Sequence, residues 1–456
     1  MTRIAPQIFK AYDIRGIVGK TLDAGVFGLI GRAVGSEALA RRQTAVVVGR
    51  DGRHSSAGLA EALIDGLRAS GVEVIDIGEV TTPLVWFAAH HLETLSGVMV
   101  TGSHNPPEYN GAKIMLGGET LAGEAIQKLR ARIEAAEFDE GAGGYRKEDV
   151  REAYYDRICG DLRLNRRMNV VVDAGNGVAG AVAPVLYRRL GCRIRELFCE
   201  VDGDFPHHHP DPAKPDNLAD LAHALAVTDA ELGLAFDGDG DRLGVVTKDG
   251  MVIYPDRLLM LYAADALSRQ SGGKIVYDVK SSRLVAPWVK KHKGRAVMAR
   301  TGHSYMKAKM KETGALVGGE LSGHLFFAER WYGFDDGVYA GARLLEILSQ
   351  FDDPSAVLHN LPQGMSTPEI QIPMKEGEPH ALIDRLRASA RFPDAELVTL
   401  DGLRVEYADG FGLLRASNTT PVLVLRFEGD DSKALKRIQA TFRQLLAKEI
   451  GGDLPF

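Results

Sequence analysis

Three aspartates stand at alternate positions in a glycine-rich stretch that follows a short apolar run. The stretch reads LGLAFDGDGDRLGVV and contains Asp237, Asp239 and Asp241. Glycines between them let the backbone curl, so the three carboxylates can converge on one hard cation. Oxygen ligands of this kind suit Mg²⁺, which binds a few carboxylates and leaves room for a phosphate oxygen. The loop therefore predicts a magnesium site, and a solvated acidic turn is the simpler alternative.

Two other kinds of protein have an aspartate loop of similar pattern. A calcium-binding EF-hand loop needs Gly and Glu where this chain has Arg242 and Lys248, so that interpretation fails. An apolar strand that ends in D-x-D-G also resembles the haloacid-dehalogenase type of phosphotransferase, whose first aspartate is phosphorylated. That pattern usually continues with Thr or Val at the position of Asp241. The third aspartate favours a metal loop, and Asp237 stays open as a nucleophile.

A serine lies in a second polar stretch, TGSHNP, which also follows an apolar run. Ser103 near a Mg²⁺ site can accept a phosphoryl group, because the metal neutralises charge on the transferring oxygens. A loop or helix cap is the alternative role of such a stretch. A hydrolase of the Ser-His-Asp kind is disfavoured, because the adjacent Ser103 and His104 point differently and the sequence has no G-x-S-x-G elbow.

Two further loops carry groups that bind sugars and phosphates. The stretch GGELSGHLFF offers Glu320, Ser322 and His324 at alternate positions, where carboxylate and hydroxyl groups can bind sugar hydroxyls. A polar turn explains this stretch almost as well. The stretch RASNTTP combines an arginine with neighbouring hydroxyl and amide groups, which together make a receptor for a dianion such as phosphate. Its members are Arg415, Ser417, Asn418, Thr419 and Thr420.

The elements that carry these loops follow a repeated pattern. Short apolar runs begin at Ala45, Asn169 and Lys274, and each is followed by a helix-like stretch, a second β-rich run and a third run that ends in a polar loop. Alternation of this kind predicts βα units with a largely parallel sheet, whose ligands bind beyond the carboxyl ends of the strands. We expect three similar mixed-sheet α/β domains and a smaller C-terminal α+β domain around one central cleft. The predicted boundaries are 1–149, 150–253, 254–363 and 364–456.

Composition and length limit the class of protein. The chain has 456 residues, with 45% hydrophobic and 25% charged residues, enough for several soluble cores. A net charge of −6 argues against nucleic acid as the main partner. The sequence has no apolar run of membrane-span length and no signal-like start. Three cysteines without metal-type spacing suit a reducing compartment, so we expect a cytoplasmic protein. Trp331 and Tyr332 are predicted to pack between domains.

Taken together, the loops resemble the α-D-phosphohexomutase superfamily, and within it the bacterial phosphomannomutase/phosphoglucomutase group. Four motifs occur in the family's order over nearly the whole chain: TGSHNP, DGDGDR, GELSGH and RASNTTP. Shorter matches are FKAYDIRG, GRDGR, DVKSS and RTGHSYMK. The resemblance implies a four-domain enzyme with one cleft lined by a loop from each domain.

The resemblance also implies roles for individual residues. Ser103 matches the position that carries the phosphoryl group and helps to bind Mg²⁺ with the three aspartates. Positions that match sugar and phosphate contacts, or that help to hold the substrate, are Tyr12, Arg15, Lys280, His303, Glu320, Ser322, His324, Arg415, Ser417, Asn418 and Thr419. Four residues match positions where the family has candidate acid–base residues and other groups around the phosphoserine. These residues are His104, Lys113, Arg242 and His324. Lys113 can act as a base only if its surroundings lower its pKa.

The implied reaction interconverts hexose 1-phosphate and hexose 6-phosphate, with mannose or glucose as the sugar. Phosphoserine 103 gives its phosphoryl group to the sugar, a hexose 1,6-bisphosphate forms, and the other phosphate returns to Ser103. Only a small phosphosugar is expected as partner, with no nucleic acid and no membrane, and the protein is expected to be a monomer, with a dimer as the alternative. Leu321 inside the sugar loop favours neutral hexoses over a phosphoglucosamine mutase activity. An aspartyl phosphotransferase or phosphatase is the alternative from another class.

Overall fold

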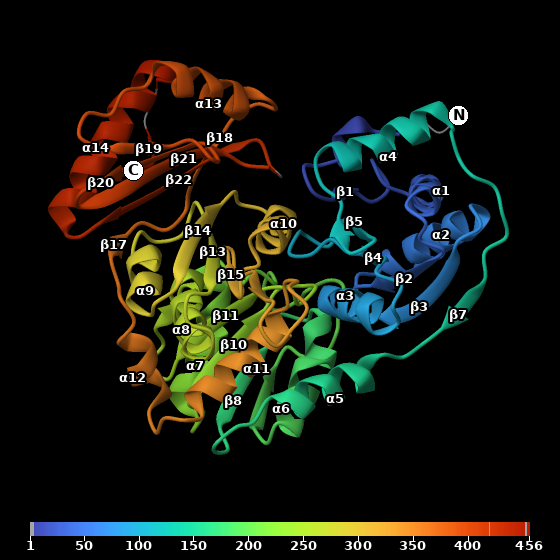
Figure 1. Cartoon of the computed structure of the whole chain (residues 1–456), viewed down its shortest axis with the longest axis horizontal. Coiled ribbons are helices and arrows are strands. Elements are labelled where there is room, and N and C mark those ends of the chain that lie inside the picture. Colours follow the sequence, from blue (N-terminus) through green and yellow to red (C-terminus); the bar gives the residue numbers. More distant parts are fainter. Residues whose placement is uncertain (1–3, 419, 452–453) are drawn as a thin grey trace. The chain divides into compact units, whose positions relative to one another are not determined.

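The computed structural model describes residues 4–418, 420–451 and 454–456. Contacts divide the chain into two compact units. Unit 1 contains the chain through Pro255 together with Ser322–Asn360, and unit 2 contains Asp256–Leu321 together with Leu361–Phe456. Figure 1 labels the elements of both units along the chain. Each unit is described by itself below.

The first sheet of unit 1 is mixed and has the strand order β1-β5-β4-β2-β3-β7, with β6 paired to β5. Its strands are β1 (Ile14–Ile17), β2 (Ala45–Arg50), β3 (Glu73–Glu79), β4 (Gly97–Val100), β5 (Tyr109–Leu116), β6 (Glu119–Thr120) and β7 (Tyr145–Lys147). The strands β2, β3, β4 and β7 run parallel, whereas β1 and β4 pair antiparallel with β5. This end of the chain also contains the short helix η1 (Pro6–Ile8).

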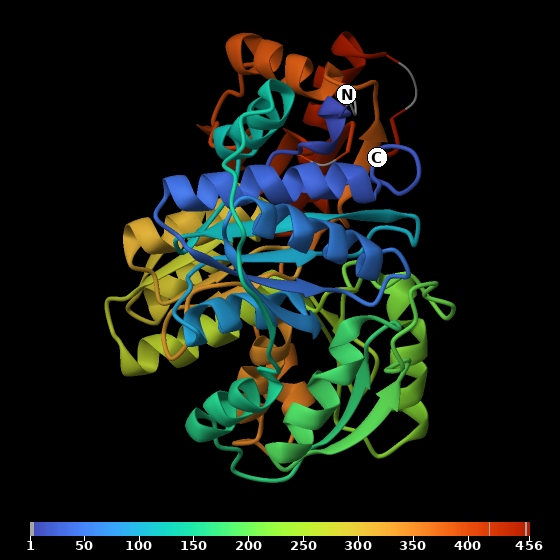
Figure 2. The same cartoon turned by 90° about the vertical axis from the view of Figure 1, so that its right-hand side faces the viewer.

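Helices cover both faces of this first sheet, because its strands are apolar on both sides. Side chains that alternate along the strands, such as Val46 and Val48, join one core with α1 and α2, while Val47 lies on the opposite face. Figure 2 shows the strands between α1 and α2 on one side and α3 on the other. The helices are α1 (Ala24–Ala40), α2 (Ser56–Ala69), α3 (Thr82–His91) and α4 (Glu124–Ala135).

The second sheet of unit 1 has the order β12-β11-β10-β8-β9. The strands β10, β8 and β9 run parallel, and β11 pairs antiparallel with both β10 and β12. Its strands are β8 (Asn169–Asp173), β9 (Arg193–Leu197), β10 (Leu232–Phe236), β11 (Leu243–Thr247) and β12 (Val252–Ile253). The helices that follow or flank it are α5 (Arg151–Asp161), η2 (Val178–Ala181), α6 (Ala183–Arg189), η3 (Pro215–Leu218) and α7 (Ala219–Val227).

The segment Ser322–Asn360 completes unit 1. It contains β16 (Leu325–Phe327), α11 (Gly337–Leu348) and α12 (Pro354–His359). Asp336 caps α11 by accepting a hydrogen bond from the backbone N–H of Tyr339, at 2.8 Å. Trp331 stacks on Tyr339 with ring centroids 4.3 Å apart and on Phe87 of α3 at 5.9 Å. The predicted packing role of Trp331 therefore agrees with its surroundings.

Unit 2 contains a parallel sheet and an antiparallel sheet. The parallel strands are β13 (Lys274–Asp278), with β14 (Arg295–Ala299) on one side and β15 (Val317–Gly319) on the other. Their helices are α8 (Pro255–Arg269), α9 (Val285–Lys291) and α10 (His303–Thr313). The antiparallel sheet has the order β17-β22-β21-β20-β19, with β18 paired to β22. These strands are β17 (Met365–Ser366), β18 (Ile370–Pro373), β19 (Glu396–Val398), β20 (Leu403–Tyr407), β21 (Gly410–Ala416) and β22 (Val422–Gly429).

Two helices pack on the antiparallel sheet, α13 (Glu378–Ser389) and α14 (Ser432–Glu449). The last helix forms because its buried residues recur every four positions, from Ala434 and Ile438 to Phe442 and Leu446. Asp431 caps its first turn by accepting a hydrogen bond from the N–H of Ala434, at 2.8 Å. The predicted fold class, three α/β domains and a C-terminal α+β domain, is confirmed by these sheets.

The repeated pattern in the sequence corresponds to equivalent strands. The runs that begin at Ala45, Asn169 and Lys274 form β2, β8 and β13, and each pairs in parallel with the two β-rich runs that follow it. The third runs form β4, β10 and β15, so the serine, aspartate and sugar loops each begin at the carboxyl end of an equivalent strand. The prediction of strand-end loops is therefore confirmed.

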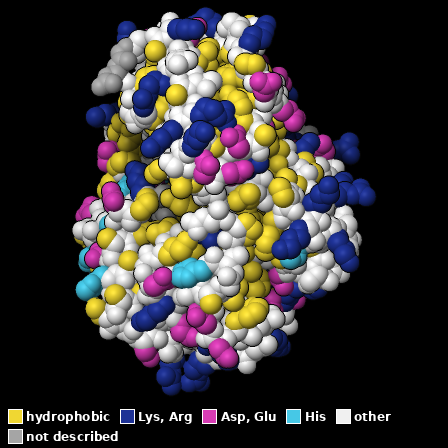
Figure 3. Space-filling view, turned by 90° about the vertical axis from the view of Figure 1, so that its left-hand side faces the viewer, with side chains coloured by type: hydrophobic (Ala, Val, Ile, Leu, Met, Phe, Trp, Pro, Cys, Tyr) yellow, Lys and Arg dark blue, Asp and Glu magenta, His cyan; other side chains and the backbone are white. Residues whose placement is uncertain are grey.

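The exterior is mixed in character. Figure 3 shows Lys, Arg, Asp and Glu side chains scattered over one face among apolar ones. Among the described helices, none combines the length and the apolar character that a membrane span requires.

Candidate functional site

The serine and aspartate loops meet inside unit 1. The Ser103 hydroxyl donates a hydrogen bond of 3.1 Å to Oδ2 of Asp237, although the two residues are 134 positions apart. A Cβ added to Gly238 would overlap the carbonyl oxygen of Ser103, so only glycine permits this approach of the two backbones. Ser103 itself has a φ of 50°, in the left-handed region that a serine rarely adopts, and is 2% exposed. The structure thus places the predicted nucleophile directly against the predicted metal loop.

The three aspartates are fully buried and close together. Asp237, Asp239 and Asp241 each offer a carboxylate oxygen, and these oxygens lie within 4.8 Å of one another. Asp237 Oδ1 accepts hydrogen bonds from the backbone N–H groups of Asp241 and Arg242, at 3.1 and 3.2 Å. Within the described chain, Oδ1 of Asp239 and Oδ1 of Asp241 accept no hydrogen bond. Buried carboxylate oxygens without a donor fit a hard cation, so the residues present can hold a divalent metal.

Lys113 supplies positive charge to the same carboxylates. Its Nζ, which β5 carries into the site, lies 2.6 Å from Asp239 Oδ2 and 2.5 Å from Asp241 Oδ2. Burial alone would lower the pKa of Lys113, but the two carboxylates outweigh burial and raise that pKa above its ordinary value. The condition under which Lys113 could act as a base is therefore not met. Lys113 is a fixed cation in this arrangement.

The pKa values of two of the carboxylates, Asp237 and Asp239, are shifted in opposite directions by their surroundings. Burial raises the pKa of Asp237 well above its usual range, and Asp239 and Asp241 raise it further. Burial also acts on Asp239, but the ammonium of Lys113 outweighs it and holds the pKa of Asp239 below the usual range. One lysine therefore does not neutralise the whole triad, and a divalent cation would stabilise the ionised form of all three aspartates.

Two of the predicted histidines, His104 and His324, also lie in unit 1. The Nδ1 atom of His104 is 3.1 Å from the Ser103 hydroxyl oxygen. Burial, followed by the charge of Arg242, lowers the pKa of His104 well below its ordinary value, so this imidazole is neutral at pH 7. Arg242 Nε donates to His324 Nε2 at 3.0 Å, so Nδ1 is the ring nitrogen of His324 that carries a proton. That Nδ1 lies 3.1 Å from Asp335 Oδ2 and 3.5 Å from Asp241 Oδ1, so two carboxylates flank this face of the ring.

Arg15 supports the serine loop from the first strand. Its Nη1 donates to the carbonyl oxygen of Gly102 at 3.2 Å and to Asn105, and its Nη2 forms an ion pair with Asp13 at 2.5 Å. Burial alone would lower the pKa of Arg242, but nearby charges, above all that of Asp237, raise it. Tyr12, in the segment before β1, adds a smaller effect in the same direction as Asp237. The structure thus brings Tyr12 and Arg15 into the neighbourhood of the serine and aspartate loops.

Unit 2 contains Glu320, the first residue of the predicted sugar loop, together with several other predicted substrate contacts. Glu320 is 1% exposed, and its Oε1 accepts a hydrogen bond of 2.5 Å from the backbone N–H of Gly302. Gly302 immediately precedes His303, the first residue of α10. Glu320 and His303, two of the predicted substrate contacts, therefore lie near each other. Lys280, after β13, forms an ion pair of 3.0 Å with Glu369. The charge of Lys280 lowers the pKa of Glu369 to about 2.

Arg415 is buried and held by a second carboxylate. Its Nε donates to Asp401 Oδ2 at 3.1 Å, and the same oxygen accepts the backbone N–H of Thr301 at 3.1 Å. Among described residues, Nη2 of Arg415 has no hydrogen-bond partner although the side chain is 4% exposed. Asn418 Nδ2 donates to the carbonyl oxygen of Thr301 at 3.3 Å, whereas Ser417 and Thr420 pair through their hydroxyls. Thr419 lies outside the described residues. A buried guanidinium N–H aimed at no protein acceptor is suited to an anion.

The predicted residues therefore fall into two groups. Unit 1 holds Tyr12, Arg15, Ser103, His104, Lys113, Asp237, Asp239, Asp241, Arg242, Ser322 and His324, and unit 2 holds Lys280, His303, Glu320, Arg415, Ser417 and Asn418. That both groups line one cleft stays a prediction. Residues that the motifs did not single out are Arg53, Thr82, Asp335, Glu369 and Asp401. Thr82 Oγ1, for example, donates to Asp239 Oδ2 at 2.5 Å from the start of α3.

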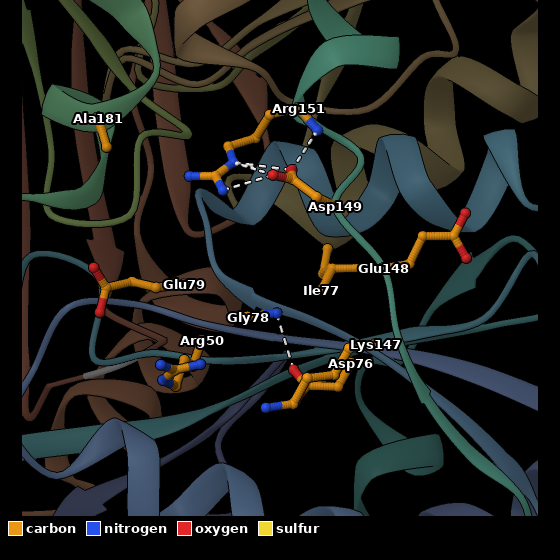
Figure 4. Close-up of a pocket in the computed structure, with 10 residues that line it drawn as sticks. All are labelled: Arg50, Asp76, Ile77, Gly78, Glu79, Lys147, Glu148, Asp149, Arg151 and Ala181. Carbon is orange, nitrogen blue, oxygen red and sulfur yellow. Dashed lines mark hydrogen bonds and ion pairs between the residues drawn. The ribbon is translucent and has the colours of Figure 1, made fainter.

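A separate cavity of about 450 Å³ lies in unit 1 beside β3 and the segment that leads into α5 (Figure 4). Its lining is largely charged and includes Arg50, Glu79 and Lys147. Figure 4 shows the pairing of Arg151 with Asp149 at its edge, at 2.7 Å. The predicted site residues do not line this cavity, so it is distinct from the serine and aspartate loops.

Comparisons with known proteins agree over the whole chain. Models of the phosphoglucomutase/phosphomannomutase family match residues 6–140, 152–250 and 254–365 as α/β/α domains I to III and residues 369–445 as the C-terminal domain. The chain is 58% identical over 450 residues to a phosphoglucomutase of Neisseria gonorrhoeae, covering 98% of each chain. It is 54% identical to a phosphomannomutase/phosphoglucomutase of Pseudomonas aeruginosa, covering 98% of this chain and 97% of the other. A crystal structure of a phosphoglucomutase/phosphomannomutase family protein from Burkholderia thailandensis superposes with a TM-score of 0.95, at 56% identity and full coverage of both chains.

Proposed function

The chain belongs to the phosphoglucomutase/phosphomannomutase family, and we propose that it interconverts hexose 1-phosphates and hexose 6-phosphates with glucose or mannose as the sugar. The reaction runs through a phosphoserine at residue 103 and a hexose 1,6-bisphosphate. The observation that carries the proposal is the contact of the Ser103 hydroxyl with Asp237 at a buried carboxylate triad. The hypothesis of an aspartyl-nucleophile enzyme is not favoured by the named relatives.

The transfer from phosphoserine to sugar requires a proton acceptor. The bond between phosphorus and Ser103 Oγ breaks and a bond between phosphorus and the sugar oxygen forms. The hydroxyl proton of the sugar goes to a base, and Ser103 Oγ takes up one proton as it leaves. Lys113 is already charged, so the remaining candidates for this task are the imidazoles of His104 and His324. His324 can accept a proton only after Arg242 releases its Nε2 atom. The bisphosphate then returns its other phosphoryl group to Ser103, which restores the phosphoenzyme.

Mg²⁺ is the proposed cation of the triad, with Ser103 as a further ligand. Hard oxygen donors are the only ligands that Asp237, Asp239 and Asp241 offer, and this donor set suits Mg²⁺. When bound, the ion supplies electrostatic stabilisation of the transferring phosphoryl oxygens. Lys113 and Arg242 hold the carboxylates that bind it in place.

The non-reacting phosphate is proposed to bind Arg415, Ser417, Asn418 and Thr419. Asp401 accepts the hydrogen bond from Nε of Arg415. The two terminal nitrogens of the Arg415 guanidinium are then oriented to donate hydrogen bonds to two oxygens of a phosphate. Lys280, Tyr12, Arg15 and His303 are proposed to complete the substrate contacts. The sugar loop is proposed to form hydrogen bonds with vicinal hydroxyls of the sugar through Glu320, Ser322 and His324. The bisphosphate can then bind in both orientations, because the equatorial hydroxyls of the ring exchange places.

Arg415→Lys is expected to raise the KM for hexose phosphate about 10- to 100-fold and to change kcat much less. Lysine keeps the charge but cannot reproduce the fork that Asp401 orients, so ground-state and transition-state binding weaken together. Steady-state kinetics check this, with Arg391→Lys as the matched control. Arg391 lies in the same unit but is exposed, and it donates to the backbone carbonyls of Ala388 and Ala390. An unchanged KM in Arg415→Lys would remove this residue from the phosphate site.

The sugar is tested by direct comparison of three substrates. We expect comparable kcat/KM for glucose 1-phosphate and mannose 1-phosphate and a much lower value for glucosamine 1-phosphate, because Leu321 supplies no side-chain partner for an amino group. Rates measured with the purified, phosphorylated enzyme decide between them. A clear preference for glucosamine 1-phosphate would assign the chain to the phosphoglucosamine mutases instead.

The proposed setting is the cytoplasm, with the enzyme acting as a monomer. All three cysteines, Cys159, Cys192 and Cys199, are free thiols, which suits a reducing compartment. The four segments 1–149, 150–253, 254–363 and 364–456 are proposed as domains I to IV.

A further inference from the structure

Arg53 is a buried arginine whose guanidinium lies beneath the serine loop. Its side chain is 1% exposed, and Nη2 donates to the carbonyl oxygens of Ser103 and Asn105, at 2.7 and 2.6 Å. The other terminal nitrogen, Nη1, donates to the carbonyl oxygens of Pro106 and Tyr109, at 2.6 and 3.0 Å. One side chain therefore fixes four backbone carbonyls between residues 103 and 109. A guanidinium is suited to this task because its donors are held in a rigid plane.

Asp51 fixes the guanidinium and the other end of the loop. Its Oδ2 accepts hydrogen bonds from Arg53 Nε at 3.1 Å, from the Thr101 hydroxyl at 2.7 Å and from the Gly102 N–H at 3.1 Å. The Asp51 and Arg53 pair thus holds the loop on both sides of Ser103. The pair follows β2 at its carboxyl end, in the stretch GRDGR, and reaches the loop that follows β4.

The packing leaves little room for the loop to shift. A Cβ added to Gly102 would lie 2.5 Å from Arg53 Cζ, so the guanidinium presses against the backbone immediately before the serine. The ring of Phe205 lies on the guanidinium, with 5.0 Å between Cζ and the ring centroid. Arg53 is therefore held by the loop, by Asp51 and by an aromatic ring from a distant segment.

We propose that Arg53 is a positioning residue for the phosphoryl carrier, because its hydrogen bond to the Ser103 carbonyl holds the serine in its left-handed conformation and aims its hydroxyl at Asp237. The inference rests on the proposed function and assigns to Arg53 a role within it. A residue at a φ of 50° returns to a common conformation unless its surroundings hold it, and the carbonyl of that residue is where Arg53 binds. Phosphorylation places about two negative charges on Ser103 beside three carboxylates, which increases the force that displaces the loop. Arg53 opposes that displacement through its hydrogen bonds to the carbonyl oxygens of Ser103 and Asn105.

The test compares two substitutions of Arg53 with a matched substitution of another buried arginine. Arg53→Lys keeps a positive charge but cannot bind four carbonyls in one plane, and Arg53→Ala leaves a space that added guanidinium ion can fill. Arg343→Lys is the control, because Arg343 is also fully buried and paired with a carboxylate, Glu329, at 3.1 Å. Arg343 lies on α11 and has no part in the proposed reaction. Each protein is assayed for kcat, KM, melting temperature and phosphate content at Ser103 by mass spectrometry.

We expect kcat of Arg53→Lys to fall about 100-fold with KM nearly unchanged. If Ser103 is held in the wrong orientation, transfer of its phosphoryl group slows, whereas binding of the sugar phosphate is unaffected. Millimolar guanidinium chloride is expected to restore part of the kcat of Arg53→Ala and to leave Arg343→Lys unaffected. Equal kcat losses in Arg53→Lys and Arg343→Lys at equal melting temperatures would overturn the positioning role. Failure of both Arg53 variants to fold, with Arg343→Lys folded, would assign Arg53 to the fold and also overturn it. A wild-type protein without mutase activity would reject the proposed function, whereas an active wild type with a fully active Arg53→Lys rejects only this inference.

Discussion

Replacing Ser103 by alanine is expected to lower mutase activity at least about 10⁴-fold, because no other group can carry the phosphoryl group between the two half-reactions. The fold should tolerate the change, since the side chain is small and only one oxygen is lost. The contacts made by that oxygen are those with Asp237 and His104. The measurement is turnover of glucose 1-phosphate in the presence of glucose 1,6-bisphosphate, together with the melting temperature.

Phosphate mapping accompanies this substitution and separates two kinds of nucleophile. Wild-type protein incubated with hexose 1,6-bisphosphate should carry acid-stable phosphate on Ser103, and Ser103→Ala should carry none. Ser268→Ala is the matched control, because Ser268 is exposed on α8 and its hydroxyl donates to the Asp265 carbonyl of its own helix. An acid-labile phosphate on Asp237 that survives Ser103→Ala would contradict the phosphoserine mechanism.

The strands and loops of the site were predictable because their signals are local. Apolar runs that end in polar, glycine-containing loops became β4, β10 and β15, and the loops after them hold Ser103, the aspartates and Glu320. The spacing of Asp237, Asp239 and Asp241 predicted three converging carboxylates, and the structure brings their oxygens within 4.8 Å. Residue order within one loop is sufficient information for such features.

The residues that hold those loops were not predictable in the same way. Arg53, Asp335 and Asp401 act on groups elsewhere in the sequence, and Arg53 is 50 positions from the serine whose carbonyl it binds. An arginine or aspartate in a loop has the same local pattern whether it is solvated or buried against a distant carbonyl. The stretch GRDGR at the end of β2 matches the family, but its role depends on how β2 and β4 pair. Tertiary pairing therefore supplies the information that local pattern lacks.

Lys113 illustrates why charge states need the structure. From the sequence, a lysine beside a phosphoryl-transfer loop is a candidate base, provided that nearby charge or burial lowers its pKa. Burial is present, but β5 aims the Nζ atom between Asp239 and Asp241, and their charges reverse the direction of the shift. The sign of the shift depends on the partners within a few ångströms, which are more than 120 positions away in the chain.

Asp237→Asn is expected to lower activity about 10²- to 10³-fold, because it removes one carboxylate charge from the cation site while keeping the size of the side chain. An amide still accepts the N–H groups of Asp241 and Arg242, so the loop should keep its shape. In the wild type, chelation of divalent cations should abolish activity and added Mg²⁺ should restore it. The variant should need a higher Mg²⁺ concentration for half of its maximal activity.

The control for this substitution is Asp249→Asn, on an exposed turn where the carboxylate accepts the hydroxyl of Thr247 at 2.6 Å. It makes the same change of charge at a distance from the triad and should leave the Mg²⁺ dependence unchanged. Titration of Mg²⁺ by calorimetry gives a readout that is independent of turnover, and binding should weaken in Asp237→Asn alone. Full activity of the chelated wild type, or equal Mg²⁺ binding in the wild type and Asp237→Asn, would show that the buried carboxylates serve only to pair with Lys113. The two substitutions therefore separate a metal loop from a structural ion pair, because Lys113 contacts Asp239 and Asp241 and leaves Asp237 to the serine.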